Sequence, residues 1–201
     1  SRIPAYKRSD LAAAQSDARS VFEYWTHALS YLPVEAMRFY TATMKAHRRD
    51  PAGWGGNVSD YQFRKLINRI RDEGPLSISD IKDDRLVEKE HLWASRKPSK
   101  KALQAGFYSG RLVISQRQGM LKTYELTERH FGWERLPKPA SPGQTLRYVL
   151  DRALRAQGIV SLESVCFNNT YAKPDISKTE IAALIEREVR GKRLVPVSIE
   201  G

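Results

Sequence analysis

One segment near the middle of the chain has the residue types best suited to binding a polyanion. From His91 to Tyr124 there is no aspartate or glutamate, although roughly four would be expected at the average acid content of the chain. Lysine and arginine bind phosphate oxygens, and the net charge of +11 also favours a polyanionic partner. We therefore expect a phosphate-binding surface. The basic residues of this segment are Arg96, Lys97, Lys100, Lys101, Arg111, Arg117 and Lys122.

Polar residues within the same segment could contact base edges. Lys97-Pro98-Ser99 predicts the start of a helix that ends at Gly110. A rotation of 100° per residue puts Ala102, Leu103, Gly106 and Phe107 on a core side and Lys101, Gln104 and Tyr108 on the outward side. This arrangement is typical of a recognition helix, in which lysines bind phosphates and a glutamine or tyrosine reaches a base.

A hairpin is predicted directly after this helix. Residues 112–115 and 122–126 have the composition of strands, and the turn at 116–119 puts Arg117 and Gln118 at the tip. The full predicted DNA-binding set is Arg96, Lys97, Ser99, Lys100, Lys101, Gln104, Tyr108, Arg111, Arg117, Gln118 and Lys122.

No pattern of catalytic or metal-binding residues emerges from the residues themselves. The four histidines (His27, His47, His91 and His130) are dispersed, and neither a metal-ligand spacing nor a glycine-rich phosphate loop is present. We therefore expect no metal and no cofactor. Glu23 and Glu35 lie near His27, and we expect core or capping roles for both. The single cysteine, Cys166, has apolar neighbours and is expected to be buried.

The order of the predicted elements around the basic segment is typical of a winged helix. An amphipathic helix at 61–72 is followed by a short strand and a brief helix at 76–80, and then by the third helix and the hairpin. Upstream, residues 10–46 have helical spacing, interrupted at Pro33 and resumed by Met37, Tyr40 and Met44. The first stretch of that pattern consists of Val21, Phe22, Trp25, Leu29 and Leu32.

The same order of elements begins again after the proline-rich segment 137–142. GIVSLESV (158–165) is similar to GPLSISDI (74–81), and GKRLVPVS (191–198) is similar to SGRLVIS (109–115), at offsets of about 84 and 82 residues. A single strand at 191–198 would be an incomplete wing, which predicts that the native protein continues. The expected fold class is mostly helical α+β with tandem winged helix-turn-helix domains. The expected units are an N-terminal helical segment (1–56), winged helix 1 (57–136), a linker (137–144) and winged helix 2 (145–201).

The overall composition limits the cellular compartments in which the protein is expected. No run approaches the roughly 18 apolar residues of a membrane span, no secretion signal is recognisable, and one cysteine suits a reducing compartment. These features predict a cytoplasmic protein, which a DNA ligand would place at the nucleoid. We expect a monomer that binds double-stranded DNA.

Three segments resemble the YcaQ/AlkZ family of bacterial DNA glycosylases: EYWTHALSYLP (23–33), GPLSISDI (74–81) and WASRKPSKKALQAGFYSGRLVISQRQGMLKTYELTER (93–129). The resemblance runs from about Phe22 to Glu200. It implies tandem winged helices and monofunctional excision of alkylated or crosslinked bases, in which a glutamine or carboxylate activates water and the charge on the sugar is stabilised. His27 becomes a possible neighbour of the active site.

The chain departs from the family in two respects. The catalytic Gln-apolar-Gln or Gln-apolar-Asp motif of the family lies upstream of the EYWxH segment, so no catalytic residue is assigned here. Gln116-Arg117-Gln118 matches only the outer letters of that motif, and we do not interpret it as catalytic. Ala28 also stands where the family has an acid after the histidine. The resemblance thus implies the DNA-gripping part of a glycosylase. The residues alone leave open a winged-helix transcription regulator and a non-catalytic binding module.

Overall fold

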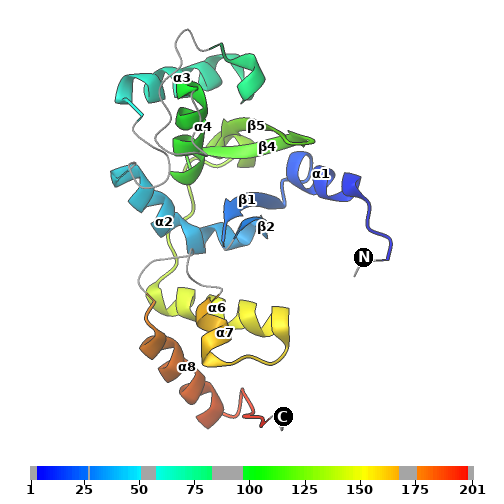
Figure 1. The fold of residues 1–201 in the computed structure, drawn as a ribbon, viewed down its shortest axis with the longest axis vertical. Helices are drawn as coiled ribbons and strands as arrows, with labels where there is room; N and C mark the ends of the chain where they lie inside the picture. Colours follow the sequence, from blue (N-terminus) through cyan, green and yellow to red (C-terminus); the bar gives the residue numbers. More distant parts are fainter. Residues whose placement is uncertain (1–3, 27, 51–57, 83–96, 168–175, 199–201) are drawn as a thin grey trace.

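Helices and two small antiparallel sheets form an elongated molecule in the computed structural model, which describes residues 4–26, 28–50, 58–82, 97–167 and 176–198 (Figure 1). The elements are α1 (Arg8–Ser16), β1 (Val21–Trp25), β2 (Leu29–Pro33), η1 (Val34–Ala36), α2 (Met37–Arg49), α3 (Asp60–Glu73), β3 (Leu76–Ser77), η2 (Ile78–Asp80), α4 (Pro98–Tyr108), β4 (Leu112–Gln118), β5 (Leu121–Leu126), α5 (Thr127–Phe131), α6 (Pro142–Gln157), α7 (Leu162–Phe167) and α8 (Lys178–Arg190). The predicted mixed α+β class is confirmed.

The first helix predicted in the N-terminal segment was wrong between residues 21 and 33. These residues form the β1–β2 hairpin, in which Val21 pairs with Pro33 and Trp25 pairs with Leu29. Apolar residues at this spacing satisfy a helical stripe, but the aromatic and β-branched composition of Val21–Trp25 favours a strand. The restart was predicted correctly, because Met37, Tyr40 and Met44 are buried along α2.

The middle of the chain forms the predicted order of helix, strand, helix and hairpin. Ser59 caps α3 by accepting a hydrogen bond from the Gln62 amide. β3, β5 and β4 form one sheet in that order, and the brief element after β3 is the 3₁₀ helix η2. The hairpin is longer than predicted: residues 116–118 belong to β4, and the turn is at Gly119 and Met120. Gly119 has φ +63°, the left-handed conformation that a tight turn requires.

Helix α4 packs closely on the sheet because Gly106 has no side chain. A Cβ atom at this position would lie 2.5 Å from Leu112 Cδ1. Gly110 ends the helix with φ +66°, and a Cβ atom there would lie 2.5 Å from Met44 Sδ on α2. The two glycines therefore hold α4 against β4 and α2.

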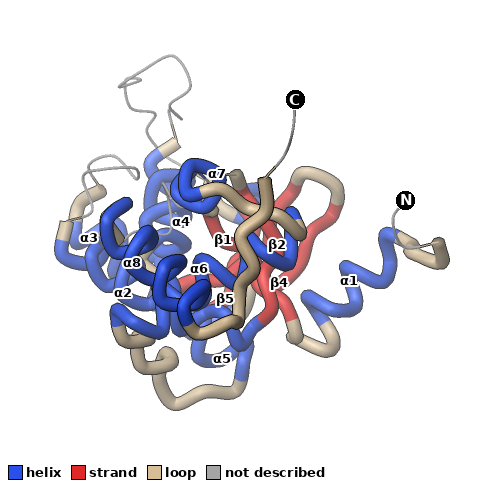
Figure 2. Tube along the Cα trace, turned by 90° about the horizontal axis from the view of Figure 1, so that it is seen from below, coloured by secondary structure: helices blue, strands red, loops and turns tan. Residues whose placement is uncertain are grey.

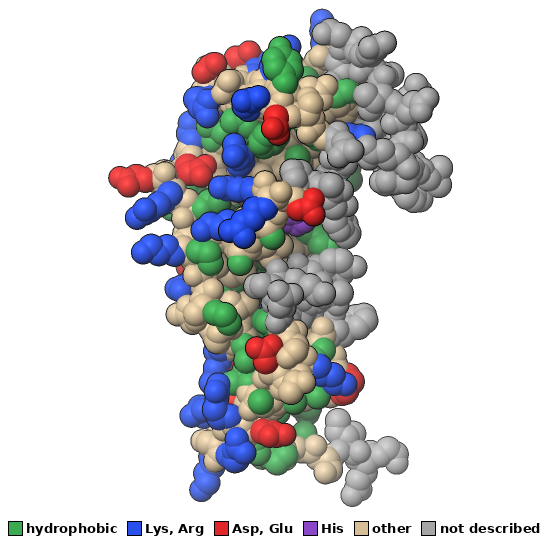
Figure 3. Space-filling view, turned by 90° about the vertical axis from the view of Figure 1, so that its left-hand side faces the viewer, with side chains coloured by type: hydrophobic (Ala, Val, Ile, Leu, Met, Phe, Trp, Pro, Cys, Tyr) green, Lys and Arg blue, Asp and Glu red, His purple; other side chains and the backbone are tan. Residues whose placement is uncertain are grey.

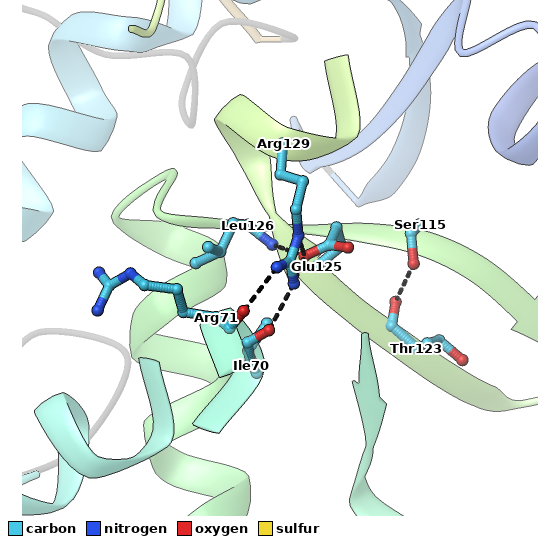
Figure 4. A network of polar contacts seen from close by, with 7 residues as sticks. All are labelled: Ile70, Arg71, Ser115, Thr123, Glu125, Leu126 and Arg129. Carbon is cyan, nitrogen blue, oxygen red and sulfur yellow. Dashed lines mark hydrogen bonds and ion pairs between the residues drawn. The ribbon is translucent and has the colours of Figure 1, made fainter. Parts of the chain in front are cut away.

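Arg129 connects α5 to the end of α3 and is part of the framework (Figure 4). Its guanidinium donates to the carbonyl oxygens of Ile70 and Arg71, and also to Glu125 Oε1 at 2.7 Å. A cation is favoured at a helix C-terminus, where carbonyl groups have no partner within the helix. Arg129 thus has a structural role, because its guanidinium binds the end of α3 and Glu125.

A second, smaller core lies between α6, α7 and α8 at the other end of the molecule (Figure 1). Ser141 and Gln144 form a capping box at the start of α6, and Ser177 and Glu180 form one at the start of α8. Cys166 is half-buried against this core. The strand predicted at 191–198 was wrong: in the described part of the chain these residues pair with no strand, and a lone strand would leave its backbone groups without ladder partners.

The first core extends across the predicted boundary at residue 56. Phe22, Met37 and Tyr40 from the N-terminal segment share one core with Leu103 and Phe107 from α4. The proposed division at 56, 136 and 144 stays a prediction.

Seen along the molecule, α1 lies at one side, next to β4 (Figure 2). No helix among the described residues has the length and apolarity that crossing a bilayer demands.

Candidate nucleic-acid interface

The first turn of α4 presents basic side chains to solvent. Lys97 precedes the helix and Pro98 is at its first position, where no amide hydrogen is needed. Lys97 and Lys100 are exposed, while Ser99 and Gln104 are half-buried. This part of the predicted set can therefore contact a ligand.

The outward face predicted for α4 was partly wrong. Lys101 is only 7% exposed, so it lies on the buried side of the helix with Ala102 and Leu103. Tyr108 is half-buried, and its carbonyl oxygen accepts a hydrogen bond of 2.8 Å from the Tyr24 hydroxyl. A helical wheel of α4 could not predict the surroundings of Tyr108, because Tyr24 comes from β1 and His47, whose ring centre lies 5.7 Å from that of Tyr108, comes from α2.

Arg117 is the largest departure from the predicted interface. Its Nε and Nη2 atoms donate to the two oxygens of Glu23, at 2.6 and 2.5 Å, and only 1% of the Glu23 side chain is exposed. Gln15 Nε2 also donates to Glu23 Oε1 at 3.0 Å and to the Ile114 carbonyl oxygen at 2.9 Å. Arg117 therefore joins β4 to β1 and contributes little positive charge to the surface.

Lys122 is opposite Arg117 in the hairpin and forms the link between the hairpin and α4. Its Nζ lies 5.9 Å from the centre of the Phe107 ring. Burial lowers the pKa of Lys122, and the nearby Arg117 and Lys100 lower it further. Lys122 thus brings one basic group of the hairpin against α4.

The end of the hairpin carries a residue that the sequence reasoning missed. Met120 is 89% exposed at the turn, next to the exposed Gln118. Turn composition alone identified Gln118 but gave no reason to single out an apolar residue there.

Arg111 lies at the C-terminal end of α4, away from the first turn. It is exposed and stacks over the Phe63 ring at 5.5 Å. Nearby, Arg48 Nε donates to the Ser109 carbonyl oxygen at 2.7 Å. Burial lowers the pKa of Arg48, and so does Arg111. Arg48 was also missed, because it lies on α2 and only the fold brings it to this helix end.

Two predicted residues, Arg96 and His27, lie outside the described residues. Within the described part of the chain, no group of three or more His, Cys, Asp or Glu side chains could hold a metal ion. His47 and His130 lie far apart in sequence, and burial lowers the pKa of each. Glu23 is a buried structural residue, as expected.

Comparison with known proteins identifies a related fold and a family. The fold is similar to that of the DNA glycosylase AlkZ of Streptomyces sahachiroi, with a TM-score of 0.52 and 16% sequence identity. The match covers 93% of this chain and 52% of that protein, so the chain spans about half its length. The model of the AlkZ-like DNA glycosylases matches residues 1–201. The chain belongs to the AlkZ-like family of DNA glycosylases.

Proposed function

We propose that this chain is the duplex-binding part of a DNA glycosylase that acts on alkylated or crosslinked bases. The observation that carries the proposal is that Lys122 of the hairpin lies against Phe107 of α4, the helix whose first turn exposes Lys100, in a segment without acids. Two elements that present cations together form a surface on which phosphates of one duplex can bind.

In this proposal α3, β3, η2, α4 and the β4–β5 hairpin form a winged helix. The hairpin strand β4 packs against α4, as a wing lies beside a recognition helix. Lys97 and Lys100 bind phosphates, and Gln104 lies one turn further along α4, where an amide can reach a base edge. The helices α6, α7 and α8, with their own core, form the corresponding part of a second winged helix.

Base excision is proposed for the whole protein and not assigned to residues of this chain. An N7-alkylated purine carries positive charge and leaves readily, so the main task of the binding part is to hold the duplex while the target nucleotide is exposed. Binding of this kind depends on phosphates and shows little sequence preference.

Salt titration with two duplexes of unrelated sequence tests the proposal. We expect similar affinities for both duplexes and a steep loss of affinity with salt, with about 0.9 added to the log–log slope by each phosphate contact. A strong preference for one sequence, together with dimeric binding, would instead indicate a transcription regulator. Affinity that is insensitive to salt would indicate a protein-interaction module.

A further inference from the structure

A second basic site lies where α2, α6 and α8 meet, apart from the α4 interface. An open cleft of about 590 Å³ is lined there by four arginines: Arg38 on α2, Arg147 and Arg155 on α6, and Arg187 on α8. Asp151 is the acid among its lining residues. Figure 3 shows lysine and arginine side chains gathered along one edge of this side of the molecule, at both of its ends.

The charge beside the cleft is only partly neutralised. Glu188, whose side chain is 1% exposed, accepts two hydrogen bonds from Arg147, at 2.7 and 2.6 Å, and two from Arg193, at 2.5 and 2.9 Å. These hydrogen bonds lower the pKa of Glu188, so it stays ionised. Arg187 also approaches Glu188, at 3.8 Å. Five guanidinium groups therefore face two carboxylates, and a surplus of positive charge remains.

Hydrogen bonds fix two of the cleft arginines, Arg147 and Arg38, in position. A guanidinium has five N–H donors, and Arg147 uses two of them on Glu188. Arg38 donates to Gln144 Oε1 at 3.0 Å. Arginines held in this way can donate their remaining hydrogens to phosphate oxygens at a reduced cost in side-chain entropy.

The aromatic rings at the cleft favour a backbone ligand over a stacked base. Phe39 and Tyr148 stack on each other, with ring centres 4.0 Å apart and an angle of 6° between their planes. Arg38 lies over Phe39 at 5.8 Å, and Arg152 lies over Tyr148 at 5.8 Å. Both rings thus already have an aromatic neighbour and a cationic one, which leaves phosphate binding as the chemistry that the cleft offers.

From these observations we infer that the arginine-lined cleft binds the phosphodiester backbone of a duplex, as a second contact beyond the α4 interface. The inference rests on the proposed function. The α4 interface lies in one half of the elongated molecule and the cleft in the other (Figure 1). A duplex must therefore be long enough to reach both sites.

The double variant Arg155→Gln/Arg187→Gln tests the inference. Both arginines are exposed, and Glu188 keeps its hydrogen bonds to Arg147 and Arg193, so the fold is expected to persist. Anisotropy would be measured with duplexes of about 10 and about 30 base pairs, roughly 34 and 100 Å long. Lys7→Gln/Arg8→Gln is the matched control, because it removes two exposed cations from the region of α1.

We expect the cleft variant to bind the long duplex on the order of tenfold more weakly at low salt, with a salt slope reduced by about 1.8. Binding to the short duplex and the behaviour of the control should match the wild type. Equal affinities of the cleft variant and the control for the long duplex would overturn the inference. Saturable binding of a nucleoside monophosphate that is lost in the variant, without any effect on the duplex, would also overturn it and assign the cleft to a small phosphate ligand. If the wild type bound neither duplex, the proposed function itself would fail.

Discussion

In each half of the molecule a carboxylate whose side chain is only 1% exposed binds arginine, with opposite consequences for the surface. In the first half, Glu23 binds a single arginine, Arg117, and the two charges cancel. In the second half, Glu188 binds both Arg147 and Arg193, with Arg187 nearby, and positive charge is left over. The number of basic residues in a segment therefore does not determine its surface charge; the acids that the fold brings to it do.

The strongest test of this comparison is removal of the acid in the first half. Glu23→Ala leaves Arg117 without its acceptor in a largely buried place and removes one of the two acceptors of Gln15 Nε2, so we expect a loss of roughly 3–5 kcal/mol in the free energy of unfolding. Urea denaturation would measure it. Glu35→Ala removes an exposed acid and should change stability by no more than about 0.5 kcal/mol.

A compensating double variant sharpens that result. Glu23→Leu/Arg117→Met removes both charges, and we expect it to recover most of the lost stability, because apolar replacement of a buried ion pair is often neutral. If the double variant were as unstable as Glu23→Ala, the loss would come from packing around Glu23 and not from the unpaired arginine.

The two halves also differ in how closely a glycine is packed against its neighbours. Gly106→Ala places a methyl group against Leu112, and overpacking of this kind costs about 1–3 kcal/mol. Gly143→Ala, at the start of α6, meets nothing within 4 Å and should be neutral or slightly stabilising. Thermal unfolding of the two variants gives the comparison. Equal stabilities would show that Leu112 can move away from the new methyl group.

The aromatic contact between the halves should contribute less to stability than the buried ion pair of Glu23 and Arg117. Stacked aromatic pairs add about 0.5–1.5 kcal/mol, so a double-mutant cycle of Phe39→Ala and Tyr148→Ala should give a coupling energy in that range. Calorimetry of the double variant should show a broader transition as the two cores become less coupled. Additive effects of the two substitutions would mean that the stack contributes nothing to the connection.

The smallest expected difference between the two halves is in how their stability responds to pH. Burial lowers the pKa of His130 and of His47, so the unfolded chain binds more protons near pH 6 and stability is lost as the pH falls below about 6.5. Residues 137–201 contain no histidine. Between pH 7 and 5, hydrogen exchange should therefore increase around α2 and α5 more than around α6 and α8. A uniform increase would indicate another titrating group.

Local patterns predicted the fold well wherever one element determined the outcome. The helix that ends at Gly110 and the order of β3, α4 and the hairpin follow from spacing and capping residues. The predictions failed where a distant segment decides. Arg117 has the features of a surface residue until Glu23, 94 positions away, is brought to it. The segment from Val21 to Leu32 failed for a local reason: its apolar spacing fits a helix, whereas its aromatic and β-branched composition favours the hairpin.

The candidate interface shows the same limit. Lys100 and Lys122 could be identified because they belong to one acid-free segment, whereas burial of Lys101 depends on contacts that no helical wheel contains. Arg48 and Ser109, to which it donates a hydrogen bond, come from segments far apart in the chain, and so do the cleft arginines on α2, α6 and α8. Only the fold brings the members of each group together.

The central claim is that the exposed lysines of α4 bind the phosphates of a duplex. Its most direct test compares the salt dependence of duplex affinity for Lys97→Gln/Lys100→Gln with that of the wild type. We predict a log–log slope lower by about 1.8 and similar losses on unrelated sequences, since each lysine releases about one counterion. A slope unchanged by the two substitutions, in a folded variant, would contradict the claim.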